Sequence, residues 1–412
     1  MKGKAPADGV SSADTGTATI ASDGEYMSAR DAAEALGVSV QTLYVYVSRK
    51  SIRSQPIPGS RQRRYWKADV ERVVRRESAT PPSVGQLSQD SKITLNTDSS
   101  LFYRGQSATD LAERSSFEAV AALLWGFTEK EAFGAAAPKV PKIAPALFKL
   151  LARESEIDRA CIILPLFEAA NPKAYDLSPL GMARSGADVL RTIAAVAAGS
   201  SRPTTEPIHE FIAGRIGADS LQTELIRRQL ILAADHGFEA GAVAVRALAA
   251  TGVTLWRSVI AGLTVTLGTR TRLSGWGAVA RLLAEIIASP NPAQPVVERI
   301  RAGEAVPGFH APLHAHGDPR GRALLGFCAT ALAKDADYQK LAEALAAAKH
   351  IQGLEPNFAL AFLFVDGKTG VGPRRSLFHV GRCAGWIAHA IEQFQSGEGE
   401  RMRGVYKGAL PV

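Results

Sequence analysis

The spacing of hydrophobic residues divides the 412-residue chain into four regions. Residues 1–25 are rich in Ser, Thr, Ala, Gly and Asp and carry almost no large apolar side chains, which predicts a disordered tail. Residues 26–76 show short helical patterns, and 77–91 are polar with two consecutive prolines, as expected of a linker. From residue 92 to 412 nearly every segment has a helical period, so the expected fold class is mainly α.

The second region contains the signals of a helix-turn-helix. Ser28 is an N-cap candidate before a helix over 29–36, and Gly37 is expected to end that helix in a left-handed conformation. Ser39 is then expected to cap a second helix over 40–49. In helix-turn-helix proteins the second helix enters the DNA major groove. The candidates for facing the bases are its polar and aromatic outer residues Gln41, Thr42 and Tyr44.

The rest of this region completes a small module. Val40, Leu43 and Val47 form the apolar stripe of the second helix. Residues 52–65 fit a short hairpin, or wing, with arginines at its tip, and Asp69 is the expected cap of a third helix. The module resembles the small MerR-type and excisionase-type winged helix-turn-helix domains, most specifically in the phrase SARDAAEALGVSVQTLYVYV.

Positive charge is concentrated in the same module. Residues 27–76 hold eleven Lys and Arg against four Asp and Glu, so +7 of the chain's formal net charge of +8 lies there. Such a block is typical of a surface that binds a polyanion, although a basic helical adaptor that binds no DNA remains an alternative. We expect duplex DNA as a partner, with phosphate or groove contacts from Arg49, Lys50, Arg61, Arg63 and Arg64.

The long C-terminal region is predicted to be helical after one hairpin. Residues 93–103 favour a short hairpin, and apolar stripes at 191–198, 225–232 and 242–249 predict helices. No run reaches the roughly 18 apolar residues that a membrane span needs, and no secretory signal is visible. The three cysteines are far apart in apolar helical contexts, so we expect reduced core residues in a cytoplasmic protein without a bound cofactor.

A polar loop is predicted at residues 307–321, which read PGFHAPLHAHGDPRG. Its glycines and prolines forbid a continuous helix, and alone it would fit an ordinary surface turn equally well. It holds three of the eight histidines and an Asp-Pro-Arg turn. The stretch resembles the citrate synthase signature PGFGHPLYPDGDPRA, in register and without a gap, and the resemblance runs from about residue 92 to the C-terminus. It implies an all-α fold with a large domain, a small domain inserted at roughly 270–370, and a homodimer with sites shared between subunits.

The citrate synthase family joins an acyl-CoA to a keto acid, whose carboxylates are held by one histidine and three arginines. This binding set looks complete. The sequence ADHG at 234–237 is similar to the family's ADHE/ADHG segment, DPR holds one arginine, and LFHVGRCAGWIAHAIEQ resembles the segment of another. The resemblance implies a carboxylate ligand, with CoA or acyl-CoA as a further candidate ligand. The implied binding residues are His236, Arg320, Arg382 and, from the neighbouring subunit, Arg403.

The family's catalytic set looks degenerate. The resemblance places Ser274 at the enol-binding histidine, Ala311 at the carbonyl-activating histidine and Asn357 at the general base. A rival alignment deletes the aspartate altogether, and in either case no base is left, because an amide cannot accept that proton. Candidates for relocated catalysts are His310, His314, His316 and Glu355. Three histidines on a loop with Pro and Gly lack the fixed geometry of a metal site, so no metal is expected.

These features predict a DNA-binding transcriptional regulator with a catalytically degenerate citrate synthase-like domain that senses a di- or tricarboxylate or an acyl-CoA. Two alternatives stay open. One is a divergent citrate or 2-methylcitrate synthase, or a citryl-CoA lyase, that carries a DNA-binding domain. The other is a partner subunit that modulates an active synthase by hetero-oligomerisation.

Overall fold

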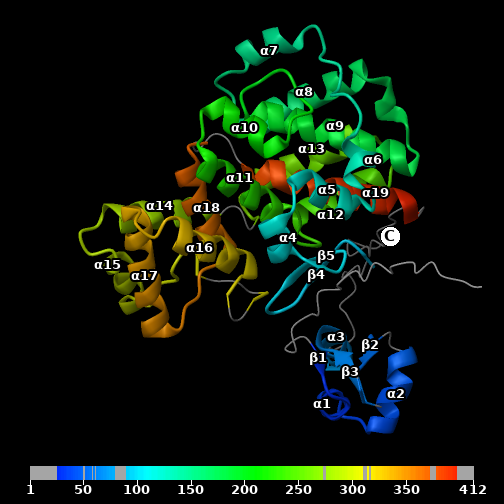
Figure 1. Cartoon of the computed structure of the whole chain (residues 1–412), viewed down its shortest axis with the longest axis vertical. Coiled ribbons are helices and arrows are strands. Elements are labelled where there is room, and N and C mark those ends of the chain that lie inside the picture. Colours follow the sequence, from blue (N-terminus) through cyan, green and yellow to red (C-terminus); the bar gives the residue numbers. More distant parts are fainter. Residues whose placement is uncertain are drawn as a thin grey trace, which may run out of the picture. The chain divides into compact units, whose positions relative to one another are not determined.

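The computed structural model describes residues 26–49, 52–57, 59–60, 62–78, 90–271, 275–309, 313–314, 317–371 and 377–396, with the side chains of 48–49, 72 and 75–78 left out. The chain divides between Gln89 and Asp90 into two compact units (Figure 1). The predicted tail at 1–25 and most of the predicted linker lie outside the described residues. The expected boundaries of the large and small domains stay predictions.

The first unit has the predicted helix-turn-helix. The side chain of Ser28 accepts a hydrogen bond from the backbone N–H of Asp31, and Gly37 has a φ of 64°. The Oγ of Ser39 accepts from the N–H of Thr42 at 3.1 Å, so all three capping predictions are confirmed. The elements are β1 Tyr26–Met27, α1 Ala29–Ala35, α2 Val40–Arg49, β2 Ser54–Pro56, β3 Arg63–Trp66 and α3 Lys67–Ser78.

The predicted wing is the antiparallel pair β2–β3, which β1 extends to a three-stranded sheet in the order β1-β3-β2. Leu43 is fully buried, but Val40 is 37% exposed, so the expected apolar stripe is wrong at its first position. The expected cap role of Asp69 is also wrong. Asp69 lies inside the first turn of α3, where its carboxylate accepts from the backbone and guanidinium of Arg53. This bond joins the wing to the third helix.

The second unit is built almost entirely from helices around one hydrophobic core (Figure 1). The predicted hairpin is present as β4 and β5, and β6 completes a small sheet in the order β4-β5-β6. The elements are β4 Thr94–Asn96, β5 Leu101–Tyr103, β6 Gln106–Ser107, α4 Ala108–Arg114, α5 Phe117–Trp125, α6 Glu129–Phe133, α7 Ala144–Leu150, α8 Glu156–Ala170, η2 Pro172–Tyr175, α9 Pro179–Ala197, α10 Ile208–Ile216, α11 Ser220–Ala233, α12 Ala240–Ala249, α13 Leu255–Thr266, α14 Trp276–Ala288, α15 Gln294–Arg301, α16 Pro319–Ala331, α17 Ala336–Gln352, α18 Phe358–Thr369 and α19 Leu377–Ser396.

The central helix is α19, which packs against α5, α9, α11, α12 and α13. Residues on every side of it are buried, as expected of a helix inside the core. Helices α14 to α18 gather on one side of the unit and contribute residues to the same core, and α16 and α18 also touch α11 (Figure 1). That contact brings the loop before α16 toward the turn that follows α11.

Two glycines let α19 approach α11 closely. A Cβ on Gly381 would lie 2.7 Å from the carbonyl oxygen of Leu230, and one on Gly385 would lie 2.3 Å from Oδ1 of Asp235. Side chains cannot occupy those positions unless the backbone moves. The pair of helices is therefore fixed by the glycines of the GRCAG sequence.

Replacement of Gly385 by alanine is expected to destabilise the protein by about 1–3 kcal/mol, because it overpacks the contact between α19 and the turn after α11. Chemical denaturation measures the change. Gly214→Ala is the matched control, since Gly214 lies in α10 with open space around its Cβ position. That change should be neutral or stabilise by up to about 1 kcal/mol. Equal stability of the Gly385→Ala variant and the wild type would contradict the packing argument.

Other sequence predictions can be compared directly. Cys328 and Cys383 are buried, Cys161 is half-buried, and all three are free thiols, as predicted. Among the described residues, no helix is both long and apolar enough to cross a bilayer.

Candidate functional site

The Asp-Pro-Arg sequence begins a helix instead of forming an isolated turn. Asp318 is the N-cap of α16, and Pro319 occupies the first helical position. The backbone N–H of Arg320 donates to Oδ1 of Asp318 at 3.0 Å. Asp as N-cap followed by Pro is a common helix start, so the sequence held this signal. The helix fixes the direction of the Arg320 side chain.

His236 is held in a tight turn between α11 and α12. The hydroxyl of buried Tyr103 donates to the carbonyl of Ile231 at 3.1 Å, and the N–H of Asp235 donates to that hydroxyl at 3.3 Å. The side-chain amide of Asn96 donates to the carbonyl of His236 at 3.1 Å. The β4–β5 hairpin therefore holds the backbone of the turn that carries His236.

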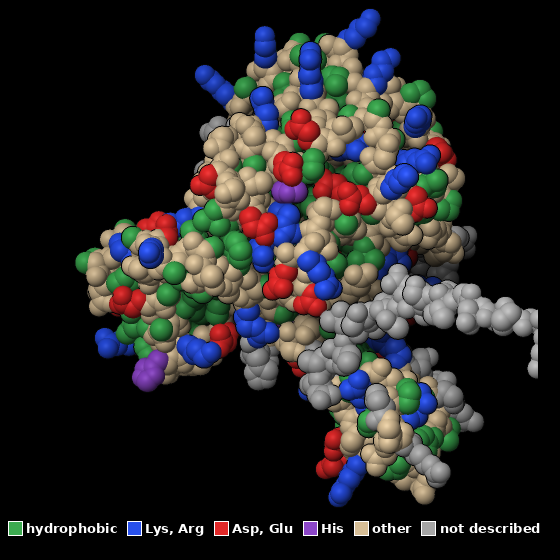
Figure 2. Space-filling model, in the orientation of Figure 1, with side chains coloured by type: hydrophobic (Ala, Val, Ile, Leu, Met, Phe, Trp, Pro, Cys, Tyr) green, Lys and Arg blue, Asp and Glu red, His purple; other side chains and the backbone are tan. Residues whose placement is uncertain are grey.

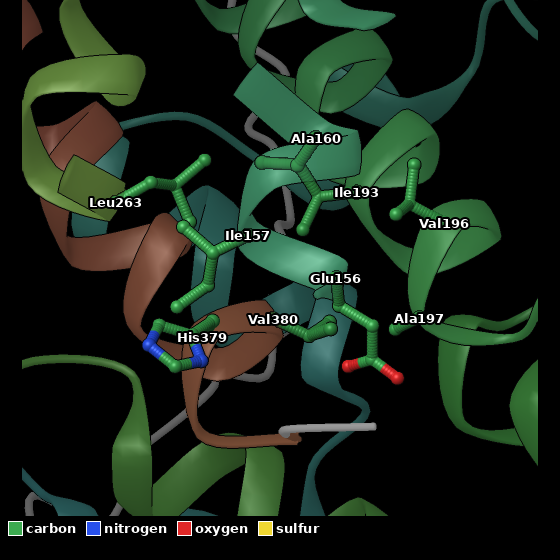
Figure 3. Close-up of a pocket in the computed structure, with 9 residues that line it drawn as sticks. All are labelled: Glu156, Ile157, Ala160, Ile193, Val196, Ala197, Leu263, His379 and Val380. Carbon is green, nitrogen blue, oxygen red and sulfur yellow. The ribbon is translucent and has the colours of Figure 1, made fainter. Parts of the chain in front are cut away.

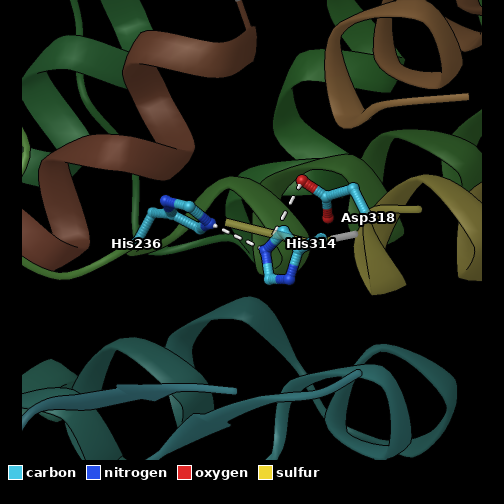
Figure 4. A group of neighbouring side chains, drawn as sticks. All are labelled: His236, His314 and Asp318. Carbon is cyan, nitrogen blue, oxygen red and sulfur yellow. Dashed lines mark hydrogen bonds and ion pairs between the residues drawn. The ribbon is translucent and has the colours of Figure 1, made fainter. Parts of the chain in front are cut away.

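The fold brings His236 to His314, which is 78 residues away in sequence. Their Nε2 atoms are 3.4 Å apart and the ring centroids 5.7 Å (Figure 4). His314 Nε2 lies 4.0 Å from Oδ2 of Asp318. All three side chains are buried. Of the three histidines in the predicted loop, His314 is therefore placed in the site, whereas His310 and His316 lie outside the described residues.

Arg320 is paired with the cap of its own helix. Its Nε and Nη2 donate to Asp318 at 3.0 Å and 2.7 Å, and the guanidinium lies 4.1 Å from the ring centroid of Phe358. Burial raises the pKa of the Asp318 carboxyl, but the charge and hydrogen bonds of Arg320, together with a contribution from His314, outweigh it and the net pKa is lowered. Burial lowers the pKa of His314, with the charges of Asp318 and Arg320 acting in opposite directions. At neutral pH His314 is therefore neutral and Asp318 is ionised.

Arg382 reaches the same region from α19. It is 3% exposed, its Nε donates to the carbonyl of Ala233 at 2.8 Å, and its guanidinium lies over the ring of Phe378. Burial raises the pKa of the Tyr103 hydroxyl, and the charges of Arg320 and Arg382 both oppose that rise. Both guanidinium groups are thus within electrostatic reach of one hydroxyl. Arg403 lies outside the described residues.

One of the expected degenerate positions has a clear structural role. The side chain of Asn357 caps α18 by accepting from the N–H of Leu360 at 3.2 Å, and its own N–H donates to the carbonyl of Gly308 at 2.7 Å. Glu355, a candidate for a relocated base, forms an ion pair with Lys349 at 2.7 Å. Ser274 and Ala311 lie outside the described residues, so their roles stay predictions.

Sequence reasoning missed a buried pair behind the site. Asp235 and His389 are both fully buried, with Nε2 of His389 3.4 Å from Oδ1 of Asp235. Burial raises the pKa of Asp235, but His389 and Arg382 more than offset it and hold the pKa at about 2. The carboxylate also accepts from the N–H of Gly237 at 2.7 Å, which tightens the turn beside His236. The aspartate preceding His236 was a visible signal, whereas no sequence spacing connects His389 with that aspartate.

The first unit presents part of the predicted DNA-binding set. Gln41 is exposed and Tyr44 is 54% exposed on α2, whereas the hydroxyl of Thr42 bonds to that of Ser39 at 2.9 Å. Arg63 is exposed and donates to Ser54, and Arg64 lies 4.6 Å from the ring centroid of Tyr26. Lys50, Arg61 and the side chain of Arg49 are outside the described residues.

Charged side chains on the surface are of mixed sign, whereas the two arginines of the candidate site are buried. On the face of the second unit shown in Figure 2, Lys and Arg are interleaved with Asp and Glu. The site cations Arg320 and Arg382 are buried instead. Buried arginines with a planar fork of donors are suited to binding carboxylates in a bidentate manner.

A separate pocket lies between α8, α9, α13 and α19 (Figure 3). Glu156 and His379 are its polar side chains, and the remainder of its lining is apolar. Burial, with a smaller effect of Arg382, lowers the pKa of His379 to about 4, so this ring is neutral at pH 7. Among the described residues the lining holds no Lys or Arg, and a carboxylate there would face Glu156. The described lining therefore offers less to a carboxylate than the region of Arg320 and Arg382 does.

Comparison with known proteins gives two family models that match this chain. The family model described as citrate synthase, C-terminal domain, matches residues 83–403, and a helix-turn-helix domain model matches residues 26–78. Citrate synthase 2 of Bacillus subtilis is 24% identical over 364 residues, covering 80% of this chain and 96% of that protein. Citrate synthase of Haloferax volcanii is 31% identical over 189 residues, covering 43% of this chain and 48% of that protein.

Solved structures give the same fold. Citrate synthase from Pyrobaculum aerophilum superposes with a TM-score of 0.67 at 21% identity and covers 79% of this chain and 91% of that chain. Citrate synthase from Thermotoga maritima gives a TM-score of 0.64 at 22% identity and covers 80% and 95%. Since the family model spans most of the chain, this protein belongs to the citrate synthase family and carries an N-terminal helix-turn-helix domain in addition.

Proposed function

We propose that the protein is a DNA-binding transcriptional regulator whose citrate synthase-like domain binds a di- or tricarboxylate without catalysing the synthase reaction. Citrate, oxaloacetate and methylcitrate are the candidate ligands, and an acyl-CoA is a further one. In this proposal the protein acts as a homodimer, and Arg403 from the neighbouring subunit completes each carboxylate site. Ligand binding changes the affinity of the helix-turn-helix domains for duplex DNA.

The observation that carries this proposal is the contrast between the two sets of residues. His236, Arg320 and Arg382 are buried in one region and supply the donors that a carboxylate needs. Asn357, at the position expected for the general base, uses its side-chain oxygen to cap α18. An amide oxygen has no useful basicity at neutral pH, so binding can persist where proton abstraction cannot.

Relatives support the ligand class. A solved ternary complex of carboxymethyl coenzyme A and oxaloacetate with citrate synthase from Thermoplasma acidophilum shares the fold, with a TM-score of 0.60 and 19% identity. The exposed Gln41 and Tyr44 on α2, together with the positive charge of the module, support DNA as the partner. Family membership alone favours the alternative of a divergent synthase or lyase.

Purified protein is not expected to increase the rate at which CoA thiol is released from acetyl-CoA in the presence of oxaloacetate. The reason is that Asn357 cannot act as the base and that Ser274 and Ala311 lack imidazole rings. A CoA-reactive thiol reagent measures the rate, with propionyl-CoA as a second substrate. A turnover rate of roughly 1–1000 per second, which is common for enzymes, would contradict the proposal and favour the enzyme alternative. Co-purification with an active synthase would instead support the subunit alternative.

Operator affinity is expected to change with ligand by about 5- to 150-fold, the range usual for coupled sites. The measurement is DNA binding with and without citrate, oxaloacetate, methylcitrate or acetyl-CoA at constant salt, because phosphate contacts make affinity strongly salt-dependent. Chloride of equal ionic strength serves as the control. Identical curves with every ligand, and no ligand binding by calorimetry, would mean that the second domain only dimerises the first.

A further inference from the structure

Three potential metal ligands meet in the same buried region as the proposed carboxylate site and share His236 with it. His236, His314 and Asp318 each place one ligand atom within 4.8 Å of the others, and all three are buried (Figure 4). They come from the turn after α11, the loop before α16 and the N-cap of α16. We propose that they form a binding site for a divalent first-row transition-metal ion, for which Zn²⁺ is the reference.

The distance between the two histidines fits two ligands of one metal ion as well as a long hydrogen bond. Their Nε2 atoms are 3.4 Å apart, longer than the 2.7–3.2 Å usual for N–H···O hydrogen bonds. Two ligands of a tetrahedral ion at about 2.0–2.1 Å are separated by about 3.3–3.4 Å. The Nε2–Oδ2 separation of His314 and Asp318 is 4.0 Å, and the three ligand atoms lie within 4.8 Å of one another, so the Asp318 carboxylate must move toward the rings to complete the set.

Asp318 keeps an acceptor position for the ion. Its Oδ1 accepts from the N–H and Nε of Arg320, and its Oδ2 accepts from Nη2 of Arg320. A carboxylate offers about four acceptor positions, so one remains on Oδ2, the oxygen nearest His314. Arg320 would then act as an outer partner that orients the carboxylate of Asp318 toward the ion, as is common around metal sites. Its positive charge weakens binding of a cation, so the site is expected to be weaker than an all-cysteine structural site.

The type of ligand limits the type of ion. Two imidazoles and one carboxylate suit Zn²⁺, Co²⁺, Ni²⁺ or Fe²⁺, whereas Mg²⁺ and Ca²⁺ prefer sites made of oxygen atoms. Three protein ligands leave at least one coordination position for water or an anion. The proposal does not depend on the regulatory function, since metal binding is measured without DNA or carboxylate.

The expectation that no metal binds was based on the spacing of histidines in one loop. The fold adds His236, which no sequence spacing connects to that loop. The second unit therefore supplies all three ligands from segments that lie far apart in the sequence.

The test uses full-length protein without a polyhistidine tag, freed of metal with a chelator and kept in buffer without carboxylic acids. Titration with Co²⁺ should give the visible absorption bands of a low-symmetry site at one equivalent, and Zn²⁺ should displace the Co²⁺. His236→Ala and His314→Ala should each weaken binding by at least about 100-fold, more than the 10- to 100-fold usual for loss of an outer partner. His350→Ala is the matched control, because His350 is exposed on α17.

Circular dichroism and thermal unfolding check that each variant is folded, and His314→Gln offers a milder change if His314→Ala is unstable. Asp318→Asn should also reduce affinity for Co²⁺ and leave calorimetric binding of Mg²⁺ undetectable, as in the wild type. Absence of stoichiometric Co²⁺ and Zn²⁺ binding by the wild type would overturn the proposal. So would full binding by folded His236→Ala and His314→Ala variants, since the metal would then bind elsewhere.

Discussion

Carboxylate binding is expected to fall by roughly 30- to 5,000-fold in the Arg382→Ala variant. Arg382 is a buried cation, and removal of one partner from a buried hydrogen-bonded charge pair costs about 2–5 kcal/mol. Calorimetry with citrate, oxaloacetate and methylcitrate measures the loss. Arg320→Ala should behave similarly, and DNA affinity without ligand should remain that of the wild type in both variants.

The control for this experiment is Arg191→Ala. Arg191 is also buried and donates to the backbone carbonyls of Phe133 and Ala135, which resembles the bond from Arg382 to Ala233. Its removal should reduce stability but leave ligand affinity unchanged. Wild-type affinity in a folded Arg382→Ala variant would exclude α19 from the carboxylate site. Wild-type behaviour of Arg382→Lys would show that charge, rather than the planar guanidinium, is what the ligand requires.

Specific DNA binding is expected to fall by roughly 30-fold or more when Gln41 and Tyr44 are both replaced by alanine. Both are exposed on α2, and each contact with a base edge contributes about 1–3 kcal/mol of discrimination. A fragment selected from random DNA, or one from the protein's own promoter, serves as the operator in an anisotropy titration. Nonspecific binding should change little, because it depends mainly on phosphate contacts.

Arg63→Ala distinguishes the two kinds of contact. Arg63 is exposed on the wing, so its loss should weaken binding to specific and nonspecific DNA alike. The slope of log affinity against log salt concentration should become smaller by about 1, since one phosphate contact is lost. Lys349→Ala, an exposed cation of the second unit, should have no effect. Equal affinity of the Gln41/Tyr44 double variant and the wild type for a selected operator would contradict the assignment of α2 as the recognition helix.

The site illustrates how far sequence resemblance reaches. His236, Arg320 and Arg382 were all predicted from short motifs, and the structure places them in one buried region. The motif also indicated that Asn357 could not be a base. The resemblance did not extend to the role of this amide as the cap of α18, although Asn is a favoured N-cap residue and the sequence held that signal.

By itself, the sequence determined the local structure of this protein: the caps at Ser28 and Ser39, the left-handed Gly37, and the helical period of the second unit. These depend on interactions between residues a few positions apart, which a pattern records directly. Only the tertiary structure decided that His236 meets His314 and that Asp235 lies against His389. Those pairs depend on how α11, α16 and α19 pack, and packing is set by the shapes of side chains that are distant in sequence. The exposure of Val40 was decided in the same way, since a stripe predicts which residues share a helix face but not how much of that face another element covers.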